Sequence, residues 1–283
     1  MRPMLGTYVE IQVEGLDDAA ANDAIEAAFA AVDEVDRLLS SHRPDSELNA
    51  INAAAGRCMV SVSPWTRECI EAAIQVGRQS GGEFDITCRP LLDLWGFVRK
   101  EYRLPDKSEL RAALPLVNFQ DILILRNNPA HGRERCWIGL PRIGMKLDVG
   151  GIGKGFAVDK AVEALKEAGV ASGLVRAGGD LCGFGPHPWK VGIANPSDPR
   201  RAVNTFEIMN EAVSTSGDYE NFFEIRGHRY THIINPRTGW PVAHVRSFSV
   251  HSPTCTQSDA WSTALFVNPK LKPPGSIRVA DMR

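Results

Sequence analysis

The feature that most constrains the fold of this chain is a glycine-rich segment that leads into an amphipathic helix, within residues 146–180. It contains Asp148, four glycines in six residues, and Lys154 among those glycines. Beyond the last of these glycines, apolar residues recur at helical spacing, and Gly169 predicts the helix end. Glycines before a helix N-terminus let backbone N–H groups approach a ligand, and the helix end favours negative charge. The segment therefore indicates a phosphate site.

Two familiar glycine motifs do not fit this segment. A P-loop requires Ser or Thr after the lysine, whereas Gly155 follows Lys154. The spacing of Gly151, Gly153 and Gly155 does not match the dinucleotide-binding fingerprint. A tight turn between packed elements therefore stays an alternative to phosphate binding.

Composition excludes several classes of protein. The chain has 283 residues, of which 43% are apolar and 23% are charged, as is ordinary for a soluble globular protein. A formal net charge of −2 gives no electrostatic basis for binding nucleic acid or an anionic membrane. There is no transmembrane segment of about 18 apolar residues. The six cysteines are scattered without a C-x-x-C pair, which argues against a zinc knuckle or a thioredoxin-like site.

The N-terminus bears on location. It alternates like a strand and has neither an apolar signal region nor a lipobox cysteine. For the chain as given we expect a cytoplasmic location, or a periplasmic or inner-membrane-associated one if a signal segment has been removed.

Local patterns predict helices and strands along the chain. Alternating residues predict a strand at 7–13, and Asp17 or Asp18 then begins a helix that runs to Leu39. Ser63 followed by a proline predicts a second helix start. Further strands are expected at 60–62, 122–125, 189–194, 205–208, 222–225, 230–234 and 248–251, and further helices at 107–114 and 256–265. Because no linker-like composition interrupts them, we expect one domain.

Candidate ligands of a metal come from the last helix. Asp259 and Thr263 are four residues apart and share one helix face. A carboxylate and a hydroxyl are hard oxygen ligands that suit Mg²⁺. The alternative is a capping or solvent-facing acid with a threonine inside the helix.

Other candidate residues are also open to two interpretations. Lys154 is either a surface lysine or a charge partner for a phosphate or carboxylate. His232 is either a core histidine or a catalytic one. Asp85 and Thr87 either point the same way from an extended segment or make a turn.

Seven segments together favour one interpretation. They are LGTYVEIQV at 5–13, SSHRPDSELNAIN at 40–52, GEFDITCRPLLDLWGF at 82–97, LDVGGIGKGFAVDKAVEAL at 147–165, VRAGGDLCGFG at 175–185, AVSTSGDYENFFEIRGHRYTHIINPRTGWPV at 212–242 and SDAWSTALFV at 258–267. In these segments the chain resembles the ApbE family of FAD:protein FMN transferases. The resemblance implies an α+β fold, a single domain of mixed and antiparallel sheets with packed helices.

The resemblance also implies an activity. Such an enzyme needs Mg²⁺ and moves the FMN half of FAD onto a Thr or Ser of a target flavoprotein through a phosphoester bond, releasing AMP. The partners would be FAD and an acceptor flavoprotein with an S/T-containing motif. Mg²⁺-dependent hydrolysis of FAD to FMN and AMP, and FAD binding without turnover, are the alternatives.

The resemblance assigns roles to particular residues. His232 and Asp259 would be catalytic. The FAD contacts would be Leu5, His42, Glu83, Phe84, Asp85, Thr87, Asp148, Lys154 and Ile233. The metal ligands would be Asp259, Thr263, a backbone carbonyl near Gly151 and, in addition, the carbonyl of Ser262.

The chain departs from the family at several positions. Leu5 replaces a methionine, and His42 stands where an aromatic residue often stacks on the flavin. Asn235 replaces the aspartate of a turn that asparagine also suits. After Val267 the closing helix and strand of the family are not recognisable. We therefore expect a domain at 1–267 with an unpaired sheet edge, and a poorly ordered tail at 268–283.

Overall fold

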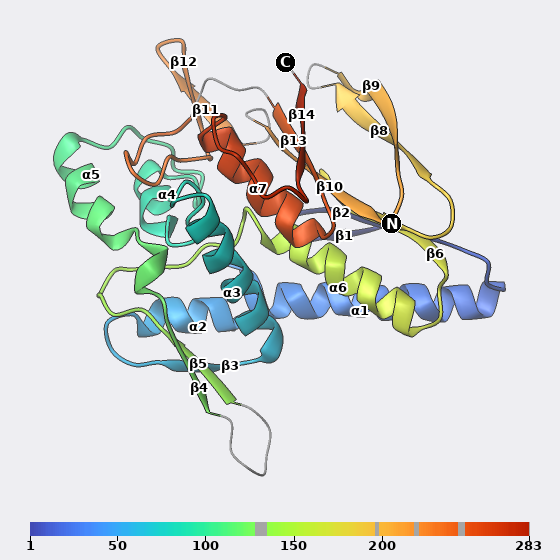
Figure 1. Cartoon of the computed structure of the whole chain (residues 1–283). Coiled ribbons are helices and arrows are strands. Elements are labelled where there is room, and N and C mark those ends of the chain that lie inside the picture. The colour runs from blue at the N-terminus through green and yellow to red at the C-terminus, as the bar shows by residue number, and fades with distance from the viewer. Residues whose placement is uncertain (128–134, 196–197, 218–220, 243–246, 283) are drawn as a thin grey trace.

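The computed structural model describes residues 1–127, 135–195, 198–217, 221–242 and 247–282 (Figure 1). The helices in this part of the chain are α1 (Asp18–Leu39), α2 (Glu47–Ala54), α3 (Pro64–Gln79), α4 (Arg89–Trp95), α5 (Lys107–Ala113), α6 (Gly153–Glu167) and α7 (Cys255–Val267). The strands are β1 (Arg2–Met4), β2 (Thr7–Glu14), β3 (Val60–Val62), β4 (Leu123–Asn127), β5 (Arg135–Gly139), β6 (Ser172–Ala177), β7 (Asp180–Phe184), β8 (Trp189–Asn195), β9 (Asp198–Ile208), β10 (Glu211–Gly217), β11 (Phe222–Ile225), β12 (His228–Thr231), β13 (Ser247–Ser252) and β14 (Arg278–Met282).

A seven-stranded sheet in the order β1-β2-β6-β7-β10-β13-β14 forms the framework. Every neighbouring pair in it is antiparallel. β7 is buried along its whole length because α6 packs on it and the β8–β9 hairpin shares an apolar cluster with its Leu181. The α+β fold with antiparallel sheets is thus confirmed.

Helices α1, α6 and α7 pack together beside this sheet, and α2 and α3 add to the same core. α1 begins where the Asp17 side chain accepts a hydrogen bond from the backbone N–H of Ala20, and its apolar stripe is buried. α6 runs alongside α1, and α7 packs against α6, β10 and β13 (Figure 1). The glycine-rich segment therefore ends at a helix that is held on two sides.

A second apolar cluster lies beside this core. It joins α4 and α5 to the β11–β12 hairpin through Leu91, Trp95, Phe97, Leu110, Phe223 and Ile234. The indole N–H of Trp95 donates to the carbonyl of Gly239 at 2.8 Å, which ties α4 to the 235–239 turn. That turn is built by the Asn235 side chain, which accepts from the N–H groups of Arg237 and Thr238. The expectation that asparagine suits this turn is met.

The C-terminal residues differ from the expectation. Instead of a poorly ordered tail, β14 pairs with β13 in an antiparallel register from Ser247↔Met282 to His251↔Arg278. The sheet edge expected to be unpaired is therefore covered. β14 is a short strand at the edge of the sheet. Its five residues carry too weak an alternation of apolar and polar side chains for the sequence to predict it.

Three smaller differences concern local structure. β5 was not expected, although it pairs with both β3 and β4. The strand expected at 230–234 ends at Thr231, and the chain bends at His232. Of the segment 212–242, residues 218–220 lie outside the described part of the chain.

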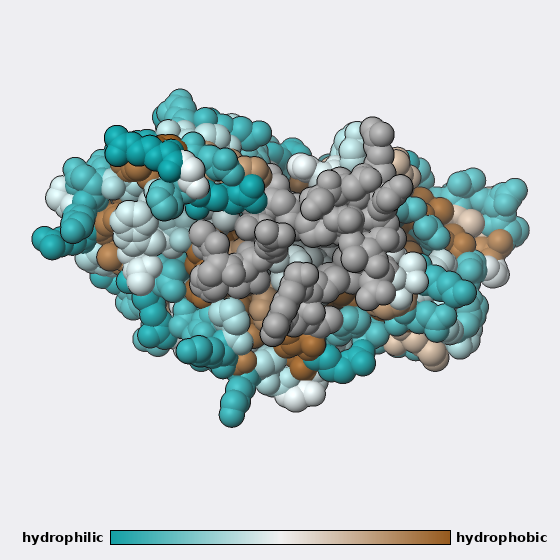
Figure 2. All heavy atoms as spheres, turned by 90° about the horizontal axis from the view of Figure 1, so that it is seen from above, coloured by the Kyte–Doolittle hydropathy of each residue, from teal (hydrophilic) through white to brown (hydrophobic). Residues whose placement is uncertain are grey.

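One face of the molecule is mainly polar in its described part. On the face seen from above, hydrophilic side chains predominate among the described residues, with apolar ones in smaller areas between them (Figure 2). Within the described ranges, no helix combines the length and the apolar character needed to cross a bilayer.

Candidate active site

One cleft crosses the N-terminus of α6. It consists of two adjoining cavities, of about 940 Å³ and about 1420 Å³ including their open mouths. Both are lined by Asp148, Gly150, Lys154, Gly179 and His232, so they meet at the glycine-rich segment. We call them the first and the second cavity.

The wall of the first cavity brings α7 against the glycines. Asp259 is buried, and its Oδ2 accepts a hydrogen bond from the N–H of Gly155 at 2.9 Å. A Cβ added to Gly151 would lie 2.9 Å from the Thr263 hydroxyl, so the backbone of Gly151 lies directly beside that oxygen. Gly151, Asp259 and Thr263 are thus brought together, as the resemblance implied.

Ser262 lies behind this group and does not line the cleft. Its hydroxyl donates to the carbonyl oxygen of Asp259 at 2.8 Å and is 2.7 Å from the Ser216 hydroxyl. Its side chain therefore fixes α7 against β10.

Lys154 lies between two buried carboxylates. Its Nζ is 3.0 Å from Oδ2 of Asp180 and 3.8 Å from Oδ2 of Asp259. Asp180 follows the two glycines that close the motif segment, but no sequence pattern assigned it a role. Lys154 is thus a charge partner of carboxylates at the centre of the cleft, one of the two interpretations, although its side chain is partly exposed.

These oxygens decide whether the site suits a metal. Within the described residues, no three or more His, Cys, Asp or Glu side chains form a group that could hold a metal ion. The oxygens that gather around Lys154 and Gly151 are instead the carboxylates of Asp259 and Asp180, the Thr263 hydroxyl and the carbonyl of Gly150. They are hard ligands of the kind Mg²⁺ takes together with waters and phosphates. The ammonium group of Lys154 near Asp259 shows that the place attracts positive charge.

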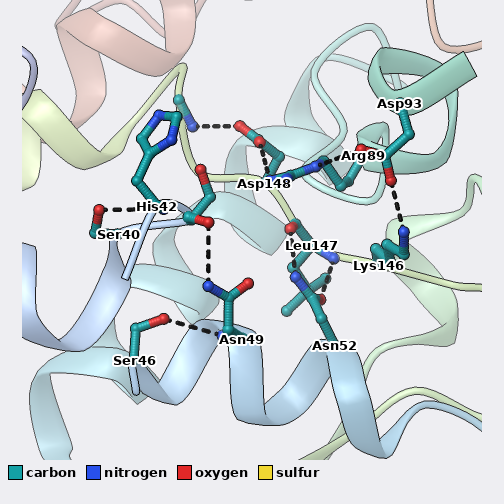
Figure 3. A network of polar contacts seen from close by, with 12 residues as sticks. Ser40, His42, Ser46, Asn49, Asn52, Arg89, Asp93, Lys146, Leu147 and Asp148 are labelled. Atoms are coloured by element: carbon teal, nitrogen blue, oxygen red, sulfur yellow. Dashed lines mark hydrogen bonds and ion pairs between the residues drawn. The ribbon is translucent and has the colours of Figure 1, made fainter. Parts of the chain in front are cut away.

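Asp148 is fixed on the wall of the cleft by an ion-pair network (Figure 3). Its Oδ1 accepts from the N–H of Gly150 at 2.8 Å, and its Oδ2 is 3.1 Å from Arg89 on α4. Arg89 also contacts Asp93, which in turn is 2.6 Å from Lys146. The carboxylate therefore has a defined orientation before any ligand enters.

His42 lines the second cavity from an exposed loop that α2 supports. The Asn49 side chain donates to the carbonyls of Ser41 and Arg43 at 3.1 and 2.8 Å, which sets the path of the chain at His42 (Figure 3). Leu5 lines the same cavity from the turn between β1 and β2.

His232 is partly buried where both cavities meet. Its Nδ1 is 3.1 Å from the carbonyl oxygen of Asn221, which can only accept, so Nδ1 carries the proton of the neutral ring. Burial lowers the pKa of His232 below its ordinary value, against a smaller raising effect of the Asn221 hydrogen bond. The ring is therefore neutral at pH 7, with Nε2 as the nitrogen that can accept a proton.

The 83–87 segment is a turn and not an extended stretch. Asp85 Oδ1 accepts from the N–H and the hydroxyl of Thr87 at 2.7 and 2.6 Å, and Oδ2 accepts from the N–H of Phe119. Burial raises the pKa of Asp85, while the hydrogen bonds from Thr87 lower it. Thr87 is fully buried and does not line the cleft, whereas Glu83, Phe84, Asp85 and Ile233 line the first cavity.

Comparison with known proteins agrees with this architecture. A sequence model of the ApbE family matches residues 5–277. A FAD:protein FMN transferase of Treponema pallidum is 34% identical over 280 residues, covering 93% of this chain and 76% of that protein. One of Klebsiella pneumoniae is 32% identical over 271 residues with the same coverage of each chain.

Solved structures show the same fold. The ApbE protein of Thermotoga maritima superposes with a TM-score of 0.81 at 30% identity, covering 93% of this chain and 84% of that one. The apo flavinyl transferase ApbE of Pseudomonas stutzeri gives 0.79 at 31% identity, covering 94% and 83%. The protein is an α+β enzyme of the transferase class. The chain belongs to the ApbE family.

Proposed function

We propose that this protein is a Mg²⁺-dependent FAD:protein FMN transferase that attaches FMN to a Thr or Ser of an acceptor flavoprotein. The observation that carries the proposal is the position of Asp259, Thr263 and Gly151 beside Lys154, in the middle of a cleft with a cavity on each side. A dinucleotide has this layout, with a pyrophosphate between two nucleoside halves. The names of the relatives supply the chemistry of that dinucleotide.

The residues present suit the metal that this function needs. Asp259, Thr263 and the backbone carbonyl of Gly151 would hold Mg²⁺. Bound there, Mg²⁺ would supply Lewis-acid neutralisation of the charge that develops on the pyrophosphate.

The side chains around the metal ligands would bind and orient the substrate. The N–H groups at the N-terminus of α6 and the ammonium group of Lys154 favour a phosphate at this point. Asp148, held by Arg89, offers an oriented acceptor to a polar group of FAD. His42 and Leu5 would border the flavin half in the second cavity.

The transfer step needs one base. Nε2 of His232 would take the proton of the acceptor hydroxyl as its oxygen forms a bond to the phosphorus of the FMN half. The phosphoanhydride bond breaks, and AMP leaves with the bridging oxygen. The neutral state of the partly buried His232 ring at pH 7 suits this role.

A single assay tests the proposal. The full chain is mixed with FAD and Mg²⁺, with and without a peptide that carries an S/T acceptor motif, and AMP and the peptide mass are followed together. A mass increase of one FMN, matched by AMP, supports transfer. AMP and free FMN with an unmodified peptide would instead indicate a pyrophosphatase, and bound FAD that stays intact would indicate a carrier.

A further inference from the structure

Glu83 is a buried acid whose charge the described structure only partly satisfies. It is 9% exposed and lines the first cavity but not the second. Its Oε1 accepts from the Asn268 side chain at 3.1 Å and lies 3.6 Å from Nε of Arg237. Its Oε2 is buried and accepts no hydrogen bond from any residue in the described ranges. A buried acceptor without a donor is costly, so a donor from a ligand would be favourable here.

The surroundings of Glu83 favour a flat heterocycle. The same end of the first cavity is lined by the buried apolar side chains of Phe84, Ile233 and Val267, and by Pro236. Apolar walls with one convergent polar group are typical of a site for a small-molecule ring. Because a carboxylate only accepts, the edge of the ring that meets Glu83 must carry a hydrogen-bond donor. The last torsion of a glutamate is soft, so the carboxylate can turn toward that donor.

The layout of the cleft indicates which half of the substrate enters this end, a step that rests on the proposed function. Lys154 lines both cavities, so a pyrophosphate beside it would send one nucleoside into each. The FMN half has to be reached by an acceptor protein, and the second cavity has the exposed His42 and Gly6 on its rim. The adenosine half leaves as AMP and can be enclosed between buried side chains.

We infer that Glu83 is a specificity-determining residue that reads the 6-amino group of the adenine of FAD. A purine with an oxygen at position 6 would place a carbonyl against the carboxylate, and both groups are acceptors. The site is thus built to accept 6-amino purines and reject 6-oxo purines. Sites that pair a buried polar group with the substrate discriminate strongly, because the wrong substrate leaves that group unpaired.

Nucleotide binding without turnover tests this inference. Binding of AMP, purine riboside 5′-monophosphate, IMP and FMN to the full chain is measured by titration calorimetry in the presence of Mg²⁺. We expect AMP to bind about tenfold or more tightly than IMP, with purine riboside 5′-monophosphate between them. AMP gains a hydrogen bond to the Glu83 carboxylate, the unsubstituted purine makes none, and IMP places a second acceptor against it.

The variant Glu83→Gln provides the second arm. Its amide can present either an acceptor or a donor, so we expect the preference for AMP over IMP to fall to within about threefold while FMN affinity is unchanged. Glu224→Gln, at an exposed position of β11, is the matched control and should keep the preference of the unmodified chain. Thermal melting shows that each variant is folded.

The outcomes separate clearly. Equal binding of AMP and IMP to the unmodified chain, or no binding of either, overturns the inference without any variant. A loss of FMN affinity in Glu83→Gln, with AMP affinity retained, also overturns it, because the flavin half would then lie at Glu83. Failure of the transfer assay with the AMP preference intact would count against the proposed function alone.

Discussion

At the scale of single residues, the centre of the cleft is an arrangement of charges. Lys154 is partly exposed, whereas the carboxylates of Asp180 and Asp259 beside it are almost fully buried. Buried acids need partners, and a lysine can be displaced by a divalent cation more easily than a planar arginine fork can. The two carboxylates outweigh the one ammonium group, so the site keeps a net negative charge that attracts a divalent cation.

The role of Asp259 in metal binding gives a prediction for Asp259→Asn. The amide oxygen can still accept from the N–H of Gly155, so the fold should be kept. The lost negative charge should lower Mg²⁺-dependent AMP release by about 100-fold or more. AMP release is measured over a Mg²⁺ titration, and Asp23→Asn, on the exposed face of α1, serves as the control. Unchanged release in Asp259→Asn would sink the metal assignment.

The neutral ring of His232 gives a prediction of pH dependence. Because burial lowers its pKa from 6.5, the ring stays neutral as the pH falls from 6.5 to the lowered value. The acid limb of AMP release should therefore lie below pH 6.5, and His232→Gln should be about 100-fold slower and lack that limb. An acid limb above pH 6.5 in the unmodified chain would contradict the base role.

The same shift affects stability. In the unfolded chain the imidazole takes up its proton near pH 6.5, whereas the folded state takes it up only at lower pH. The contribution of His232 to the free energy of unfolding is thus fully present above pH 6.5 and is lost as the pH falls through the lowered pKa. The slope of melting temperature against pH below 6.5 should be smaller in His232→Gln.

At the scale of elements, the site depends on how closely α6 approaches α7. A Cβ on Gly155 would lie 2.2 Å from the carbonyl oxygen of Cys255 and 2.8 Å from Cβ of Asp259. Only a glycine lets the two helices come this close. The hydrogen bond from the N–H of Gly155 to the Asp259 carboxylate depends on that short distance.

Gly155→Ala should therefore separate the two helices. We expect the free energy of unfolding to fall by about 1–3 kcal/mol, as for an overpacked core, and AMP release to fall with it. Chemical denaturation and the AMP assay measure the two effects. Gly275→Ala is the control, since nothing lies within 4 Å of its added Cβ. A fully stable and active Gly155→Ala would show that the helices can shift without loss.

Elements with strong local signals could be predicted from the sequence. Ser63 caps α3 with Pro64 in its first turn, and the strand at 60–62 precedes it, both as expected. Elements that depend on distant partners could not. β5 is stabilised by pairing with β3 and β4. The local turn from Asp85 to Thr87 was one of the two interpretations, but the second support of the Asp85 carboxylate comes from Phe119, far along the chain. Neither partner is visible in a local pattern.

At the scale of the whole molecule, the cleft is an assembly of distant segments. The metal-ligand candidates were predictable because Asp259 and Thr263 share one helix face and the glycines mark their partner. Asp180 and Arg89 were not singled out, because their role is visible only once β7 and α4 lie against the glycine-rich segment. Thr87 could not be told from a cleft residue, since burial behind the wall leaves no sequence signal.

The closing strand gives a prediction for the molecule as a whole. β14 covers β13, and β13 and its neighbour β10 support α7, which carries Asp259. A chain that ends at Ile277 would lack the β14 pairings and expose the edge of β13. We expect the free energy of unfolding to fall by roughly 2 kcal/mol or more, and self-association to increase, because unpaired strand edges recruit other chains.

Thermal melting and size-exclusion chromatography with light scattering measure both effects. Arg278→Ala in the full chain is the control that separates the effect of strand pairing from that of charge. It removes only the exposed ion pair with Glu211, which should contribute less than about 1 kcal/mol to the free energy of unfolding. If the shortened chain melted like the full one and stayed monomeric, β14 would be dispensable. The domain boundary predicted at residue 267 would then describe the folded unit better than one at 282. If only the shortened chain loses stability, the folded unit extends through β14.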